Sequence, residues 1–241
     1  MIGMGTIINT AAIAAGGFFG AVCGKAFRRE WRETLNMACG VSTMFIGISG
    51  AMQYMLGLAE SSPTGGGSMP VVLSLVLGGL IGELLNIEKI FEDFGEWLKQ
   101  KSGNGGDNSF INGFVTASLT VCIGAMAIVG AVRDGISGDW SVLAAKSVLD
   151  FIIVMVMTCS MGKGCAFSAV PVFILEGGIT LLAVFLKPIL TAAALGYISL
   201  VGSVLIFCVG VNLVWGKKFR VANLLPAIIL AGAAAFLPFS L

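Results

Sequence analysis

The stretch that decides the fold is residues 113–162, GFVTASLTVCIGAMAIVGAVRDGISGDWSVLAAKSVLDFIIVMVMTCSMG. Two apolar runs flank a short polar segment, so the stretch predicts two membrane-spanning helices, 110–132 and 141–161, joined by a turn over residues 133–140. The second run carries Lys146 and Asp150. Because a charged group at the centre of a bilayer costs roughly 3 kcal/mol, this pair indicates a function or a partner inside the membrane.

Composition sets the class of the whole chain. Of its 241 residues 57% are hydrophobic and 11% are charged, and the mean hydropathy is +0.98. That leaves too little polar surface to cover a soluble globule. The apolar runs are continuous and do not alternate with a period of two, which favours helices over a β-barrel. We therefore predict an all-α integral membrane protein whose first partner is the lipid bilayer.

Eight apolar runs are long enough to be read as spans. They cover residues 2–22, 36–58, 69–86, 110–132, 141–161, 165–186, 189–215 and 221–237. Residues 87–101 place apolar side chains at helical spacing among charges, which predicts an amphipathic helix on the membrane surface. Residues 102–108 form a flexible link that precedes the central hairpin.

The distribution of charge predicts the orientation. Most of the 14 lysines and arginines fall in the loops after the first, third, fifth and seventh spans. Positively charged loops remain in the cytoplasm, so both termini should lie outside it.

Weak internal repetition divides the chain into an N-terminal repeat over 1–101, a central hairpin over 110–162 and a C-terminal repeat over 165–241. The second and seventh spans align Gly47 with Gly210 and Ser49 with Asn212, and a Gly-Gly pair stands in the span before each. An offset of five spans gives the copies opposite orientations, as in many secondary transporters. Chance similarity between apolar helices is the alternative.

Several motifs carry a resemblance to a known family. They are GTIIN at 5–9, SLVLGGLIGELL at 74–85, GFVTASL at 113–119, DGISGD at 134–139, KSVLD at 146–150 and RVANLLPA at 220–227. The chain resembles the YdfK/YqgA family, bacterial polytopic membrane proteins catalogued as domain of unknown function 554. The resemblance spans nearly the whole chain and implies an inner-membrane protein without an assigned substrate. Two positions depart from the family pattern: Ala125, where relatives carry proline, and Glu176, where glutamine is usual.

The polar residues of the spans are the candidate substrate- or ion-binding residues. Asp150 lies about 13 Å into its span, and Lys146 is one turn shallower on the same face. They form either a neutralising pair or an ion or proton site. Glu176 lies near the middle of its span. It either couples transport to an ion or proton, or is a buried neutral acid that only hydrogen-bonds across helices. The remaining candidates are Asn9, Asn212 and Glu83, each with a structural alternative as an interhelical hydrogen-bonding group or a solvated helix end.

The sequence argues against an enzyme. The motif GISG, at 47–50 and 135–138, contains a serine like that of intramembrane serine proteases, but the chain has no histidine to act as its base. An intramembrane aspartyl protease needs two aspartates in the membrane, and only Asp150 qualifies. We expect no catalytic residue, metal site or cofactor and no nucleic-acid partner. The leading hypothesis is a small transporter or channel for a cation or a proton-coupled solute. The alternative is a membrane scaffold or regulatory protein, and either could form a homo-oligomer.

Overall fold

The computed structural model describes residues 2–24, 28–56, 68–101, 103, 109–122, 125–186 and 191–236. All regular elements of this part are helical, which confirms the predicted all-α class. The elements are α1 (Met4–Gly24), α2 (Arg29–Met55), α3 (Ser68–Leu85), α4 (Ile87–Lys101), α5 (Phe110–Cys122), α6 (Ala125–Ser137), α7 (Ser141–Met161), η1 (Lys163–Ser168), α8 (Ala169–Leu186), α9 (Ala192–Trp215), η2 (Val221–Leu224) and α10 (Pro226–Ala234).

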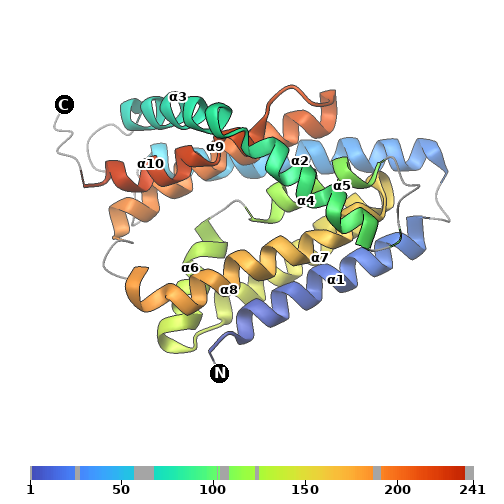
Figure 1. The fold of residues 1–241 in the computed structure, drawn as a ribbon, viewed down its shortest axis with the longest axis horizontal. Helices are drawn as coiled ribbons and strands as arrows, with labels where there is room; N and C mark the ends of the chain where they lie inside the picture. The colour runs from blue at the N-terminus through green and yellow to red at the C-terminus, as the bar shows by residue number, and fades with distance from the viewer. Residues whose placement is uncertain are drawn as a thin grey trace.

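The helices form two layers (Figure 1). One contains α2, α3, α9 and α10, and the other contains α1, α7 and α8. The most extensive contacts join α1 to α7 and α2 to α9, and α2 also touches α7. Gly16 and Gly20 of α1 lie directly against the backbone of α7 at Phe151 and Met155. Such close contact between backbones is typical of membrane helices. Hydrophobic burial does not drive their association in lipid, and small residues allow the van der Waals contact that does.

The predicted count of eight spans is not confirmed. Among the described residues five helices are long and apolar enough to cross a membrane, or up to seven if each of two bent helix pairs is one span. The last predicted span appears only as η2 and the nine-residue α10, and residues 237–241 lie outside the described part. The predicted link at 102–108 also lies largely outside it.

The fourth predicted span is not continuous. It divides into α5 and α6, which differ in direction by 61°. The interval contains Gly124, and glycine is a weak helix former. In addition, α6 continues to Ser137 through residues predicted as a turn, and it places Asp134 in the interior with no exposed surface. Asp134 accepts backbone hydrogen bonds from Gly3 and Gly5 (3.1 and 2.9 Å), so it holds the start of α1 against α6.

The helix over 87–101 has the predicted bounds, but part of its apolar face is covered by protein. Helix α4 turns 50° away from α3 and packs on α5, where the rings of Phe94 and Phe114 lie 5.9 Å apart. Leu98 is buried in this contact, whereas Ile90 and Trp97 remain exposed. The exposed side chains are the ones that could still contact lipid.

Contacts between α2 and α9 are reciprocal in the way an inverted repeat requires. A Cβ on Gly47 would lie 2.6 Å from the Phe207 nitrogen and 2.7 Å from the Ser203 oxygen. A Cβ on Gly210 would lie 2.7 Å from the Met44 nitrogen and 2.8 Å from the Gly40 oxygen. The alignment that pairs Gly47 with Gly210 also pairs Met44 with Phe207 and Gly40 with Ser203, so the two glycines make equivalent contacts. The complete repeat stays a prediction.

The two Gly-Gly pairs of the predicted repeat do not lie in equivalent interfaces. Gly16 and Gly17 touch other backbone atoms closely. A Cβ on Gly177 would instead meet only a methyl of Thr6 at 3.8 Å, and one on Gly178 would meet nothing within 4 Å. Gly177 and Gly178 therefore do not mediate close helix packing among the described residues.

Candidate functional site

Four of the predicted site residues come together between α1, α7 and α8. Lys146 and Asp150 face each other one turn apart on α7 and form an ion pair. The Lys146 Nζ also lies 3.6 Å from Glu176 Oε1 of α8, and Asn9 of α1 donates to the same oxygen at 2.9 Å. All four side chains are buried. We call these residues the buried cluster.

A backbone carbonyl completes the surroundings of the lysine. Lys146 Nζ donates to the carbonyl oxygen of Val121 at 2.8 Å. In an unbroken helix that carbonyl would accept from residue 125, but α5 ends at Cys122. The carbonyl ends of a helix carry partial negative charge, which favours a cation there. Sequence reasoning missed this group, because a backbone carbonyl carries no side-chain signal.

Two acceptor atoms of the cluster are unsatisfied. Glu176 Oε2 and Asn9 Oδ1 are buried and have no hydrogen-bond partner among the described residues. A buried polar atom without a partner costs about 1–3 kcal/mol, so each such atom calls for an explanation. A proton on Glu176 or a bound cation would supply one.

Hydroxyl groups lie on the side of the cluster nearer the start of α1. Thr6 and Thr180 approach each other at 3.4 Å between their hydroxyl oxygens, and Thr180 donates to the Ala131 carbonyl at 3.2 Å. Both are buried. Thr6 precedes Asn9 by about one turn of α1, and Thr180 follows Glu176 by about one turn of α8, so polar groups continue from the cluster in this direction.

An apolar layer closes the opposite side. Each of α1, α7 and α8 contributes an apolar residue four positions from its cluster residue. Helix α8 adds a second one, about one turn further away, and α5 adds Val121. The layer consists of Ile13, Val121, Val154, Ala169 and Val172, all buried and in mutual contact. Charged groups cannot cross such a layer cheaply, so it is a barrier between the cluster and that face of the protein.

The other two candidates lie elsewhere. Glu83 ends α3 on the surface, where its carboxylate accepts from Arg220 at 2.6 Å. Asn212 holds the loop after α9, accepting from the backbone of Lys218 and Phe219 and donating to the Phe219 carbonyl. Neither belongs to the buried cluster. Glu83 is an exposed helix end, as its structural alternative predicted, whereas Asn212 bonds to a loop and not to another helix.

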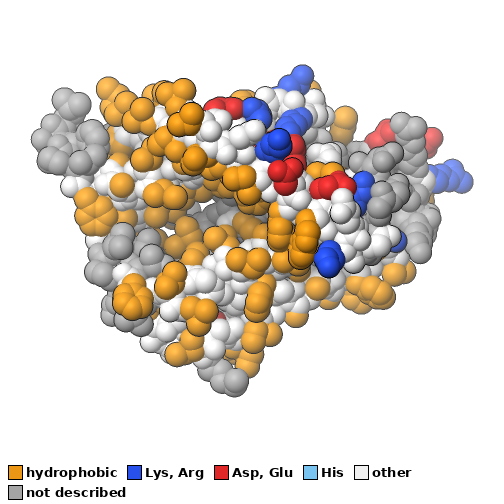
Figure 2. All heavy atoms as spheres, viewed as in Figure 1, with side chains coloured by type: hydrophobic (Ala, Val, Ile, Leu, Met, Phe, Trp, Pro, Cys, Tyr) orange, Lys and Arg blue, Asp and Glu red, His pale blue; other side chains and the backbone are white. Residues whose placement is uncertain are grey.

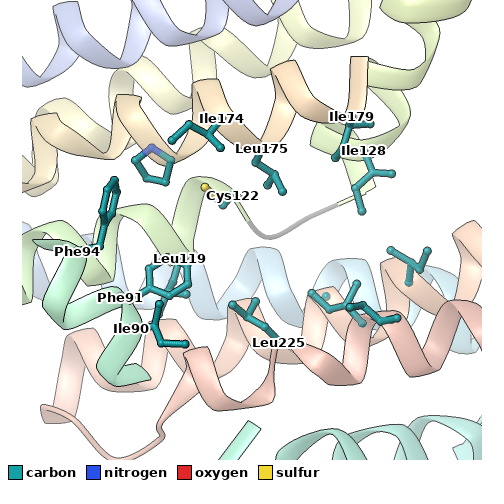
Figure 3. Close-up of a pocket in the computed structure, with 15 residues that line it drawn as sticks. Ile90, Phe91, Phe94, Leu119, Cys122, Ile128, Ile174, Leu175, Ile179 and Leu225 are labelled. Atoms are coloured by element: carbon teal, nitrogen blue, oxygen red, sulfur yellow. The ribbon is translucent and has the colours of Figure 1, made fainter. Parts of the chain in front are cut away.

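Two cavities of similar size flank α4 and α5. The first, about 560 Å³, has an almost wholly apolar lining from α4, α5, α6, α8, α9 and α10, including Phe91, Leu119 and Leu175 (Figure 3). It suits hydrocarbon and offers a hydrated cation no ligand. The second, about 550 Å³, carries amide, hydroxyl and charged groups, among them Asn36, Thr116 and Glu92.

The fold and the cluster define an all-α polytopic membrane protein with ionisable groups buried between its helices. A family model described as "Protein of unknown function (DUF554)" matches residues 4–236, and the chain belongs to that family. The chain is similar to the "Uncharacterized membrane protein YdfK" of Bacillus subtilis (strain 168), with 30% identity over 96% of this chain and 95% of that protein. It is also similar to the "Uncharacterized protein YqgA" of Escherichia coli (strain K12), with 28% identity over 95% and 94% of the two chains. No solved structure matches it.

Proposed function

We propose that the protein transports a cation, or a small solute coupled to protons, through the buried cluster. The observation that carries the proposal is the set of oxygens around the Lys146 ammonium. A carboxylate of α7, a carboxylate of α8 and the carbonyl of Val121 all approach it. Carboxylate and carbonyl oxygens are also the ligands of hard metal cations, so an incoming cation can compete with Lys146 for the same atoms.

The charges of the cluster favour coupling to protons. With Lys146, Asp150 and Glu176 all ionised, the cluster carries one net negative charge in a medium of low dielectric constant. One proton or one cation neutralises that charge. Binding of a monovalent cation then releases a proton to water, and rebinding of the proton releases the cation. The unsatisfied Glu176 Oε2 and Asn9 Oδ1 support this exchange because either occupant would give them a partner.

The helix architecture supports alternating access, in which the buried cluster opens first to one side of the membrane and then to the other. Helices broken at membrane depth and inverted repeats are recurring features of secondary transporters, whose sites lie at the break. The 61° bend between α5 and α6 adjoins the cluster, and the reciprocal contacts of Gly47 and Gly210 lie between the two copies of the predicted repeat.

Reconstitution provides the test. Liposomes that contain the protein and a pH-sensitive dye are exposed to gradients of Na⁺, K⁺ and choline. We expect at least one metal cation to drive proton movement in the opposite direction, whereas choline and protein-free liposomes give none. Absence of flux for all cations and proton-coupled solutes, with the protein correctly inserted, would favour the scaffold hypothesis.

The topology is a separate prediction. The family relationship supports a bacterial inner-membrane location, which we propose. The lysine and arginine distribution supports both termini outside the cytoplasm, a topology that requires η2 and α10 to belong to an eighth span. Charged side chains gather toward the right-hand end of the face in Figure 2, while the rest is mainly apolar. Reporter fusions after Lys101 and after Leu241 should report the cytoplasm and the outside respectively. The same side for both fusions would contradict the assignment.

A further inference from the structure

The polar cavity of about 550 Å³ opens at the end of the molecule that the topology places in the cytoplasm. Its walls come from the start of α2 and α5, the start of α4 and the end of α9. Amide and hydroxyl groups line it, from Asn36, Asn112 and Thr116. Oxygen atoms of this kind replace part of the hydration of a metal cation.

The cavity contains the same combination of charged side chains as the buried cluster, which is one lysine and two acidic residues. Lys217 Nζ lies 2.7 Å from Glu88 Oε1 and 2.9 Å from Glu92 Oε1, so one ammonium again faces two carboxylates. Glu88 is buried, and its other oxygen accepts from the backbone nitrogen of Ala222 at 3.2 Å. Burial lowers the pKa of Lys217, but hydrogen bonds to the two glutamates and their charges outweigh burial and raise it. Lys217 therefore stays protonated, and the three groups together carry one negative charge.

Helix α5 connects this cavity to the buried cluster. Asn112 and Thr116 line the cavity, and Leu119 lines its inner part. The carbonyl of Val121 that binds Lys146 is two residues further on, about 3 Å along the helix axis. The apolar layer of Ile13, Val121, Val154, Ala169 and Val172 lies on this side of the cluster. The cavity thus ends where the barrier begins.

We propose that this cavity is a cytoplasmic vestibule that binds monovalent metal cations on their way to the buried cluster, and that the Lys217 ammonium competes with the cation for Glu88 and Glu92. The inference rests on the proposed transport function. One net negative charge matches a monovalent cation, and a site this open holds the cation weakly enough to release it. The vestibule raises the local cation concentration next to the barrier, as a cleft of one charge sign does for its ligand.

Side-specific kinetics test the vestibule. In inverted and right-side-out membrane vesicles, cation-driven proton movement is measured against Na⁺ and K⁺ concentration. Lys217→Met should lower the half-saturating concentration at the cytoplasmic face several-fold, since it removes the competing ammonium. Glu92→Gln should raise it several-fold. Neither change should alter the value at the opposite face.

The chain supplies matched controls. Lys218→Met changes the neighbouring lysine of the same loop, which does not line the cavity. Glu96→Gln lies one turn further along α4, where the carboxylate accepts from Gln100. Both controls should leave the half-saturating concentration unchanged at both faces. Equal effects of the lysine substitutions at 217 and 218, or equal effects at the two faces, would overturn the vestibule.

A binding measurement separates this inference from the transport proposal. In an Asp150→Asn background, which we expect to be inactive, added Na⁺ or K⁺ should still raise the Tm of the detergent-solubilised protein, because a ligand that binds only the folded state stabilises it. Glu92→Gln should abolish most of that rise, and choline should produce none. If flux occurs but this Glu92-dependent rise is missing, the vestibule is refuted. If the rise occurs without flux in the wild type, cation binding in the polar cavity stands and the transport proposal falls.

Discussion

Replacement of Asp150 by asparagine should reduce cation-driven proton movement to the level of protein-free liposomes while the protein remains inserted. Asparagine keeps the shape and much of the hydrogen bonding of aspartate but removes the charge that a cation would neutralise. Asp150 is the ion-pair partner of Lys146 on the same face of α7. The measurement is the initial rate of dye response per amount of inserted protein, and full activity of the variant would refute a role for Asp150 in binding.

The pair interpretation needs its own control, which is Lys146→Met alone and together with Asp150→Asn. Removal of one partner of a buried ion pair leaves an uncompensated charge and costs about 3–5 kcal/mol, so the lysine substitution alone should lower the protein yield. The double change should restore the yield. If Lys146 and Asp150 only neutralise each other's charge, the double variant should also regain activity. If Asp150 binds the ion, the double variant folds and remains inactive.

Glu176 should be less sensitive than Asp150. A glutamine at this position could still accept from Asn9. Glu176 adds a second carboxylate next to Lys146, with its Oε1 3.6 Å from the Lys146 Nζ. Within the proposed exchange, Asp150 is therefore the carboxylate that binds the cation, and Glu176 adjusts the net charge of the cluster.

Hydropathy located the helices whose ends are marked by polar residues. The bounds of α4 and α7 agree with the sequence prediction to the residue, because each lies between loop residues and a change of periodicity. The break between α5 and α6 was missed, since an averaged hydropathy treats residues 110–132 as one apolar run. Asp134 was misplaced for the same reason: a charged residue near a predicted end reads as a turn, yet its carboxylate caps the start of another helix.

The candidate site was only partly predictable. Lys146 and Asp150 are four residues apart, so helical periodicity alone places them together. Asn9 and Glu176 are distant in sequence, and only packing of α1 on α8 brings them to the cluster. Polarity could not separate these from Glu83 and Asn212, because a sequence does not show which polar groups find a partner at the surface. The Val121 carbonyl carries no side-chain signal at all.

The reciprocal contact of α2 and α9 leads to the second prediction of large effect. Alanine at Gly47 or at Gly210 should destabilise the protein to a similar extent, by about 1–3 kcal/mol, because each new Cβ would press on the equivalent backbone nitrogen and oxygen of the facing helix. Gly178→Ala is the matched control within a membrane helix, since its Cβ would meet nothing within 4 Å.

Thermal unfolding in detergent measures all three variants. The control should be neutral or up to about 1 kcal/mol more stable, because alanine is the better helix former. Gly47→Ala and Gly210→Ala should both lower the Tm, and the double variant should lower it further, since the two contacts lie at different places along the same interface. Two equal losses would support a twofold relation between α2 and α9, which is what an inverted repeat requires at its centre. A loss at only one of the two positions would show that the reciprocal contact is not equivalent in energy, and the support that it gives to alternating access would disappear.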